Sequence, residues 1–476
     1  MKKKMILAAL TAAALMFSSV TVSADVPDWL KTFFGAEETE EGTESEEGDG
    51  ENVLIGDDGQ TVEDNDAFNL KVVRPGEEEE DTSSDDNPEV TFVTPDDEDA
   101  FGITVVSGED QPDDDSFTVT SPAGTGDTDA FYDEVVNGKV RSYLTGKLVP
   151  EEIGRTRPMA LMIENDKNAL EWQRGTSNAD IIYEARVEGG ITRLEAIFED
   201  YKDVPMIMPV RSCRPQFVYY AREYQAHYGH YGQVIYAVPI LQMWDSHDIA
   251  GLPYGEDGQE YRLIDGSSAY RRDHEGVTGI CTNYDMIQQF LTATGYETEY
   301  TEDYKGHFRF AGDDEEIYLK NGKSATTVET GFSNSATFYY DEDEEIYLRE
   351  EFGMPQVDHL NDEQLAFKNI IIEIGPSTML DDRYVFTDPV NDGRFGEGYY
   401  ITNGRVIPIR WRKEGWRRAD PILTTVTSVY YEFDVRECDF NVTRYYDMTG
   451  QEITLNQGKT FVEIIREEDA SGVDIY

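Results

Sequence analysis

The alternation of hydrophobic and polar positions predicts β-structure through most of the chain after residue 131. The apolar run Met159 to Ile163 is typical of a buried strand. Two further runs flank Gly189-Gly190, and this pattern predicts a β-hairpin over residues 181–198, because glycines accept the positive φ of a tight turn. A two-residue turn would place Glu184 opposite Glu195 on neighbouring strands.

That register also predicts two different faces for the hairpin. One face would be apolar and belong to the core, and the other would carry charges that either face solvent or meet charged groups from elsewhere. The expected core face holds Ile181, Tyr183, Ala185, Val187, Leu194, Ala196 and Phe198. The expected charged face holds Glu184, Arg186, Glu188, Arg193 and Glu195.

A strand-to-helix junction follows the hairpin. Residues 205–210 predict a strand, and a helical stripe made by Phe217, Tyr220, Ala221 and Tyr224 begins after Pro215. Arg211, Ser212 and Arg214 would then lie where free backbone N–H groups favour an anion. The anion is either a ligand carboxylate or phosphate, or a glutamate of the hairpin in an internal ion-pair network.

The second half of the chain predicts a mostly β structure with short strands. Asn403-Gly404 is typical of a hairpin turn. Trp411 and Trp416 fit either a sugar-binding surface or the core. The expected strands are 317–319, 336–340, 345–349, 370–372, 399–401, 406–409 and 461–465.

Charge changes the picture for the N-terminal part. The 476 residues include 97 acidic and 40 basic side chains, a formal net charge of −57. Residues 25–130 alone contain 35 acids and three bases. We expect a disordered acidic spacer there, followed by an N-terminal domain over 131–300 and a C-terminal domain over 301–476. The charge argues against nucleic acid and anionic membranes as partners.

The first 24 residues predict a signal peptide. Lys2, Lys3 and Lys4 precede an apolar run that ends near Phe17, and small residues lead to Ala24. The run is too short to span a bilayer, and no later segment qualifies. We expect a secreted or envelope-associated protein with no transmembrane segment in the mature chain. No lipobox cysteine is present in this signal, and the alternative of an uncleaved N-terminal anchor remains open.

The three cysteines leave at least one thiol unpaired or bonded between molecules. They are Cys213, Cys281 and Cys438, and the sequence does not decide which of them are bonded. Cys213 between two arginines is either an activated thiolate or a small packing residue.

Familiar catalytic signatures are missing from the sequence, including Gly-x-Ser-x-Gly, Walker A, paired Cys-x-x-Cys and His-Glu-x-x-His. His227 and His230 have no further ligand in sequence, so we expect no metal, and no cofactor is indicated. Glu184 and Glu188 on one strand face would lie about 13 Å apart, beyond the spacing of a glycosidase pair.

Several motifs together resemble the YerB-like family of bacterial extracytoplasmic proteins, many of which are lipoproteins. The motifs are Arg157-Pro-Met-Ala-Leu-Met-Ile-Glu-Asn165, Ala179-Asp-Ile-Ile-Tyr-Glu184, Val187-Glu-Gly-Gly-Ile-Thr-Arg193, Pro209-Val-Arg-Ser-Cys-Arg-Pro215 and His230, with matches in the second half at 368–373, 399–404, 409–413 and 450–460. The resemblance implies an α/β (α+β) fold, in which a layered sandwich precedes a mostly β C-terminal domain. It implies no established reaction. Members of the family tend to show Pro-His-Asn after an Arg-Asp step, whereas after Arg272-Asp273 this chain has Gly279-Ile280-Cys281-Thr282-Asn283 instead.

Two functions are consistent with these observations. The first is an envelope-associated binding or scaffold protein whose partner is a cell-wall component or an envelope protein. The second is a hydrolase that acts on wall material with the same residues. The missing catalytic signatures favour binding. The candidate ligand-binding residues are Glu184, Glu188, Arg193, Arg211, Ser212, Arg214, His230, Arg272 and Asp273.

Overall fold

A computed structural model describes residues 128–241, 247–251, 269–389, 394–413 and 442–476. The predicted signal peptide and most of the acidic spacer lie outside these ranges, as do Trp416 and Cys438. Within the described residues, no helix is both long and apolar enough to cross a membrane.

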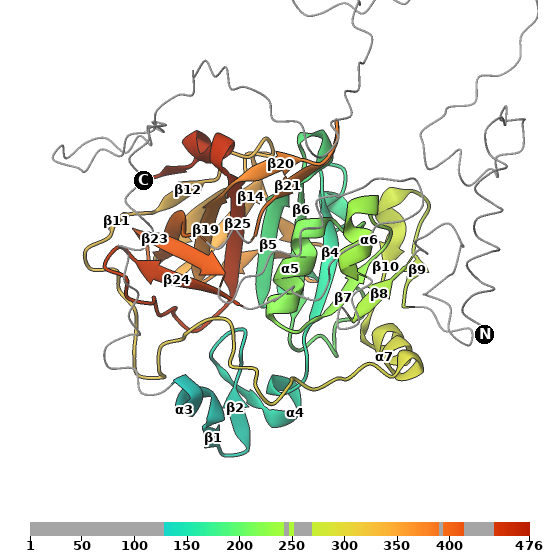
Figure 1. Ribbon diagram of the computed structural model, residues 1–476, viewed down its shortest axis with the longest axis horizontal. Helices are drawn as coiled ribbons and strands as arrows, with labels where there is room; N and C mark the ends of the chain where they lie inside the picture. The colour runs from blue at the N-terminus through green and yellow to red at the C-terminus, as the bar shows by residue number, and fades with distance from the viewer. Residues whose placement is uncertain (1–127, 242–246, 252–268, 390–393, 414–441) are drawn as a thin grey trace, which may run out of the picture. The chain divides into compact units, whose positions relative to one another are not determined.

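A mixed sheet of eleven strands forms the centre of the described part (Figure 1). Strands from both halves of the chain build it, and β25 pairs directly with β5. In spatial order the strands are β11 (Lys323–Ser324), β23 (Arg405–Lys413), β22 (Gly396–Thr402), β19 (Asn369–Gly375), β25 (Thr460–Arg466), β5 (Ile181–Arg186), β6 (Thr192–Phe198), β4 (Met159–Asn165), β7 (His227–His230) and β8 (Asp248–Ala250), with β24 (Thr443–Asp447) beside β23.

Seven of these strands run in the same direction, namely β23, β19, β25, β5, β4, β7 and β8. Their carboxyl ends therefore lie at one end of the sheet. At the other end, where β4 begins, lies a small unit made of α3 (Thr128–Asp133), β1 (Val135–Val136), β2 (Lys139–Arg141), β3 (Leu148–Pro150) and α4 (Glu151–Gly154), seen at the bottom of Figure 1.

Both faces of the central sheet are covered. On one face, Tyr183 and Ile197 pack with α5 (Pro215–Glu223), which crosses in front of β5 and β4 in Figure 1. On the other face, Ile182 and Leu194 join a second core. That core also contains residues of a second sheet and of α7 (Tyr284–Thr294). The result is a layered sandwich, which confirms the expected fold class.

The second sheet has six strands, β15 (Met354–Pro355), β14 (Ile346–Glu351), β13 (Thr337–Asp341), β12 (Thr327–Glu329), β26 (Asp474–Ile475) and β18 (Ala366–Phe367). Three further pairs are hairpins or ladders of two strands: β9 (Arg271–Arg272) with β10 (Ile280–Cys281), β16 (Val357–Asp358) with β17 (Glu363–Gln364), and β20 (Ser377–Met379) with β21 (Val385–Thr387). The remaining α-helix is α6 (Val238–Leu241), and short 3-10 turns cover 170–172, 176–178, 188–190, 235–237, 277–279 and 467–472.

Local sequence sets the ends of the two longer helices. Pro215 occupies the first turn of α5, where its missing N–H is not needed. The side chain of Asn283 accepts a hydrogen bond from the Met286 amide at 3.0 Å and caps the start of α7. Gly295 ends α7 with a φ of 70°, a conformation that glycine adopts without steric cost.

Most of the expected strands are present. The apolar run after Arg157 forms β4, and those near 336, 345, 370, 399, 406 and 461 correspond to β13, β14, β19, β22, β23 and β25. The turn at Asn403-Gly404 is confirmed, with φ values of 50° and 70°. Two predictions were wrong: residues 317–319 form no strand, and residues 205–210 make only isolated bridges.

The predicted hairpin register was also wrong, although the hairpin itself exists. The turn holds three residues, Glu188 to Gly190, and the amide of Val187 donates to the carbonyl of Ile191 at 2.9 Å. Glu184 therefore pairs with Leu194, not with Glu195. The one-residue shift moves Glu184 and Glu195 to opposite faces of the sheet, and both faces are buried.

Candidate functional site

The carboxyl ends of the parallel strands bring together three arginines and two glutamates. We call this group the arginine cluster; it consists of Glu164, Glu188, Arg193, Arg211 and Arg214. Glu164 is the penultimate residue of β4, and Arg193 lies opposite it on β6. Arg211 and Arg214 belong to the connection that leads into α5, and Glu188 lies in the hairpin turn. In open α/β sheets, ligands bind at this end of the strands.

Backbone hydrogen bonds fix the connection before α5 between two strands. The amide of Arg211 donates to the carbonyl of Met162 on β4 at 2.9 Å. Its carbonyl accepts from the amide of Tyr231, just after β7, at 3.0 Å. The amide of Cys213 then donates to the carbonyl of Gly232 at 2.9 Å. The two arginine side chains thus project from a backbone that is held at both sides.

Glu164 is the buried centre of the cluster, with 2% of its side chain exposed. The Arg211 Nε atom forms an ion pair with Glu164 Oε2, and Arg193 Nη2 lies 3.7 Å from Oε1. Burial raises the pKa of Glu164, and the two arginines act in the opposite direction. Glu164 is therefore the carboxylate partner of two guanidinium groups. A quarter of the Arg211 side chain remains exposed to solvent.

Glu188 pairs with Arg214 at the edge of the cluster. Arg214 Nε donates to Glu188 Oε2 at 2.6 Å, and Nη2 donates to Oε1. Burial opposes ionisation of Glu188, but the hydrogen bonds and charge of Arg214 prevail and lower its pKa. The Glu188 side chain is 28% exposed and that of Arg214 only 6%. In this bidentate pair the Glu188 carboxylate lies nearer the surface, and the charges of Glu188 and Arg214 balance each other.

Arg193 lies beneath these groups and is almost fully buried. Its Nη1 donates to the Ser212 carbonyl at 2.9 Å, whereas its Nε has no hydrogen-bond partner among the described residues. Burial, with the neighbouring charge of Arg214, lowers the pKa of Arg193 to about 10. The cluster thus contains a buried guanidinium whose charge is only partly balanced, and its one carboxylate partner is shared with Arg211. Ser212 contributes its carbonyl to this arrangement, and its hydroxyl donates to the Tyr231 carbonyl at 3.2 Å.

Glu184 lies apart from the cluster, on the other face of the sheet. It is fully buried and forms an ion pair with Arg349 of β14, which also bonds Glu351 at 3.0 Å. Asn165 and Asn334 donate to the same Glu184 oxygen at 2.9 and 2.8 Å. This network is closed to solvent and joins the two sheets, although Arg349 Nε has no hydrogen-bond partner among the described residues.

His230 is also buried, at the end of β7. Its Nδ1 lies 2.7 Å from the Gly232 carbonyl, and its Nε2 lies 2.8 Å from Asp248 Oδ1. His227 points elsewhere and stacks on His247 with ring centroids 5.2 Å apart. Among the described residues, no group of three histidine, cysteine or acidic side chains could hold a metal ion.

Arg272 and Asp273 lie on the exposed hairpin of β9 and β10. Arg272 Nη1 donates to the Gly276 carbonyl at 2.8 Å, within the same hairpin. The hairpin touches the cluster through Val277, whose carbonyl accepts from Arg211 Nη1 at 3.3 Å. Of the predicted site residues, the structure brings together Glu188, Arg193, Arg211, Ser212 and Arg214. Glu184, His230, Arg272 and Asp273 lie outside this group.

The described residues offer no activated nucleophile at this site. Cys213 is fully buried and free, and burial raises the pKa of its thiol well above the ordinary range. Cys281 is likewise free and buried. Trp411 belongs to the core, where its Nε1 donates to the carbonyls of Ile374 and Glu397 at 3.1 and 3.0 Å.

The sequence did not single out Glu164, the residue that holds two of the arginines. It follows the apolar run of β4, and its position opposite Arg193 depends on a pairing between β4 and β6. An acidic side chain at the end of a buried strand was the available signal. Arg349 and Glu351 gave no signal, because they lie on an ordinary alternating strand far along the chain.

Two family matches cover more than half of the chain. Residues 144–297 match the "Protein of unknown function (DUF3048) N-terminal domain", and residues 326–425 match its C-terminal domain. The chain is 26% identical to the "Putative lipoprotein YerB" of Bacillus subtilis (strain 168) over 287 residues, which are 59% of this chain and 80% of the relative. The crystal structure of YerB from Bacillus subtilis superposes with a TM-score of 0.55 at 23% identity and covers 71% of this chain and all of that one.

The chain therefore belongs to the YerB-like family, as its motifs indicated. The family is one of unknown function, and the solved structure shows the fold that the two chains share.

Proposed function

We propose that this protein is an extracytoplasmic, envelope-associated binding protein that holds an anionic cell-wall component at the arginine cluster. The curated relative, whose description reads "Putative lipoprotein YerB", supports the location. The observation that carries the binding site is the sharing of Glu164 between Arg193 and Arg211, with Arg211 still 25% exposed. Glu164 divides its negative charge between Arg193 and Arg211. A ligand carboxylate or phosphate bound to Arg211 would add the further negative charge that the two guanidinium groups lack.

The position of the cluster supports the same proposal. It lies at the carboxyl ends of the parallel strands, where loops rather than paired strands surround a ligand. The N-terminus of α5 follows Arg214 directly and adds its dipole to the local positive potential. Guanidinium groups in a partly dehydrated setting bind phosphate and carboxylate through two parallel hydrogen bonds.

The test is retention of the purified protein on isolated cell wall, before and after chemical removal of the phosphate-containing wall polymers. The wild type should bind intact wall and lose most of that binding on stripped wall. Arg211→Met should lower retention by about tenfold, since one charged hydrogen-bonded pair contributes at least 1.4 kcal/mol. Arg211→Lys keeps the charge but loses the planar fork and should fall between the two.

Arg405→Met is the matched control, because Arg405 is exposed on β23 and, within the described part of the chain, its side chain donates only to the Gly322 carbonyl, at 2.9 Å. Its retention should equal that of the wild type. All variants are compared at equal folded concentration, checked by their thermal unfolding. A folded Arg211→Met protein that binds intact wall as well as the wild type would remove the cluster as the binding site.

A further inference from the structure

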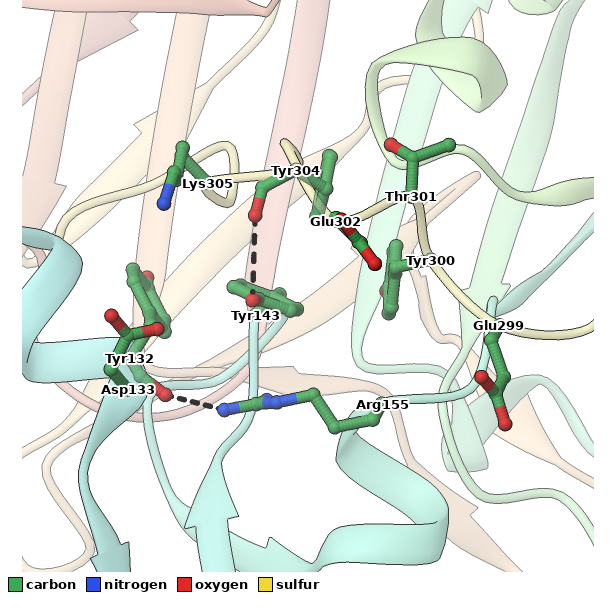
Figure 2. Close-up of a pocket in the computed structure, with 10 residues that line it drawn as sticks. All are labelled: Tyr132, Asp133, Tyr143, Arg155, Glu299, Tyr300, Thr301, Glu302, Tyr304 and Lys305. Carbon is green, nitrogen blue, oxygen red and sulfur yellow. Dashed lines mark hydrogen bonds between the residues drawn. The ribbon is translucent and has the colours of Figure 1, made fainter.

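A second concave site lies at the opposite end of the sheet from the arginine cluster. A cavity of about 280 Å³ opens between the small N-terminal unit and residues 299–305 (Figure 2). It is lined by Tyr132, Asp133, Tyr143, Arg155, Glu299, Tyr300, Thr301, Glu302, Tyr304 and Lys305. We call it the tyrosine pocket. Nine of its ten lining residues fall outside the ranges 144–297 and 326–425 that match the family.

Four tyrosines form a fixed aromatic wall. Tyr300 and Tyr304 stack in parallel, with ring centroids 4.6 Å apart and 7° between the planes. Tyr143 meets both edge-on, with centroids 5.1 and 5.0 Å away, and Tyr132 packs on Tyr143 at 4.8 Å. Each ring is therefore braced by at least one other, which reduces the entropy cost of ordering the wall around a ligand.

Arg155 crosses the pocket below these rings, as Figure 2 shows. Its guanidinium lies 4.9 Å from the centre of the Tyr143 ring and donates to the carbonyls of Arg141, Gly154 and Tyr132. Within the described ranges it forms no ion pair with a carboxylate. Arg155 is thus anchored by neutral acceptors and keeps its positive charge available to the pocket.

One polar group in the wall has no partner. The hydroxyl of Tyr300 is buried and makes no hydrogen bond with any described group. Leaving a buried hydroxyl unpaired costs free energy, so a ligand or a water molecule that reaches it is favoured. Asp133 and Glu302 add exposed carboxylates at the rim, which are strong hydrogen-bond acceptors.

We propose that the tyrosine pocket binds a saccharide. Sugar hydroxyls can accept from Arg155 and exchange hydrogen bonds with Tyr300, while they donate to Glu302. The C–H faces of a sugar ring can pack on the tyrosines, whose rings are apolar and whose hydroxyls are polar. The volume of about 280 Å³ lies near the lower end of the general scale of small-molecule pockets.

Other ligand classes fit less well. Asp133, Glu299 and Glu302 would repel a small inorganic anion. An organic cation would meet Arg155, which already covers a face of Tyr143. A purely apolar molecule would leave the Tyr300 hydroxyl unpaired. The inference is independent of the anion site proposed above, because the two sites share no residue.

The test is isothermal calorimetry of the full mature chain with cellobiose and N,N′-diacetylchitobiose as probes. At least one probe should bind saturably to the wild type. Tyr300→Phe removes only the unpartnered hydroxyl, and Glu302→Gln changes one exposed acceptor; each should weaken binding about tenfold, the effect of one good hydrogen bond. Both variants should unfold at the wild-type temperature, because neither lost group bonds another residue in the part of the chain that the structure describes.

Tyr318→Phe and Arg211→Met are the controls. Tyr318 is 54% exposed and outside the pocket, and Arg211 belongs to the arginine cluster, so neither change should alter saccharide binding. Absence of saturable binding by both probes would overturn the proposal. Binding that Tyr300→Phe and Glu302→Gln leave unchanged would also overturn it, because the saccharide would then be bound elsewhere.

Discussion

Arg349 of β14 forms an ion pair with Glu184 of β5 across 165 positions of sequence. Both side chains are fully buried, and the pair joins the second sheet to the central sheet. Arg349 also donates to Glu351 at 3.0 Å, so two carboxylates depend on one guanidinium. Removal of the guanidinium would leave negative charge in the core without a partner.

We therefore expect Arg349→Met to lower the free energy of unfolding by about 3–5 kcal/mol. Urea unfolding measures this value. Combining Arg349→Met with Glu184→Gln should recover part of the lost stability, because the second change removes the Glu184 carboxylate, which Arg349→Met leaves without a partner. Arg383→Met is the control, since Arg383 is 68% exposed and should cost almost nothing. A loss below about 1 kcal/mol for Arg349→Met would show that the core tolerates the unpaired acids.

The hairpin shows what the sequence could and could not predict. Alternation located β5 and β6, and Gly189-Gly190 located the turn between them. The register failed because Glu188 joined the turn, and a glycine pair does not reveal how many residues a turn contains. That single residue decided whether Glu184 and Glu195 share a face.

Long-range contacts explain the remaining failures at the sites. The sequence predicted that Glu188, Arg193, Arg211 and Arg214 form one group. It could do so because the hairpin and the strand-to-helix junction that carry them are each recognised from neighbouring residues. It could not place Glu184 beside Arg349, because that contact requires the second sheet to fold over the first. The tyrosine pocket could not be predicted from the sequence either, because its walls come from three segments, near residues 132, 143 and 300, that only the fold brings together.

Glu373 of β19 should make stability depend on pH. Burial raises its pKa to about 8, although the Tyr445 hydroxyl donates to it at 2.6 Å. The folded protein therefore keeps the proton, whereas the unfolded chain releases it near pH 4.3. The contribution of Glu373 is fully present below that pH and is lost as the pH rises to about 8.

Glu373→Gln should flatten this dependence. Within that window, the slope of the unfolding free energy against pH should become less negative by up to about 1.4 kcal/mol per pH unit. Urea unfolding at several pH values from weakly acidic to weakly alkaline gives the slope. Glu344→Gln, at an exposed position, should leave the slope unchanged. Equal slopes for wild type and Glu373→Gln would mean that Glu373 is ionised in the folded protein.

Gly398 of β22 allows two strands to approach closely. A Cβ atom at this position would lie 2.0 Å from the carbonyl oxygen of Ile372, on the neighbouring β19. Gly398→Ala should therefore destabilise the fold by about 1–3 kcal/mol or more, because the contact is with backbone that cannot rotate away. Gly312→Ala is the control, with nothing within 4 Å of its added carbon. Similar melting temperatures for both variants would contradict the close packing.

Arg193 and Arg349 are both buried arginines, and we expect them to differ in their effect on stability. Arg349 alone neutralises the Glu184 and Glu351 pair, whereas Arg193 shares Glu164 with Arg211 and is repelled by Arg214. Arg193→Met leaves Glu164 with its nearer partner and removes that repulsion. We expect it to cost about 2 kcal/mol or less, mainly for the lost hydrogen bond to the Ser212 carbonyl.

The same replacement should weaken retention on cell wall, because it removes part of the positive potential beneath Arg211. Unfolding in urea and the wall-retention assay, applied to one preparation, separate the two effects. Small destabilisation with reduced retention agrees with a cluster that holds more positive charge than its own acids balance. A stability loss as large as that of Arg349→Met would instead show that Arg193 is a structural residue whose charge Glu164 neutralises completely.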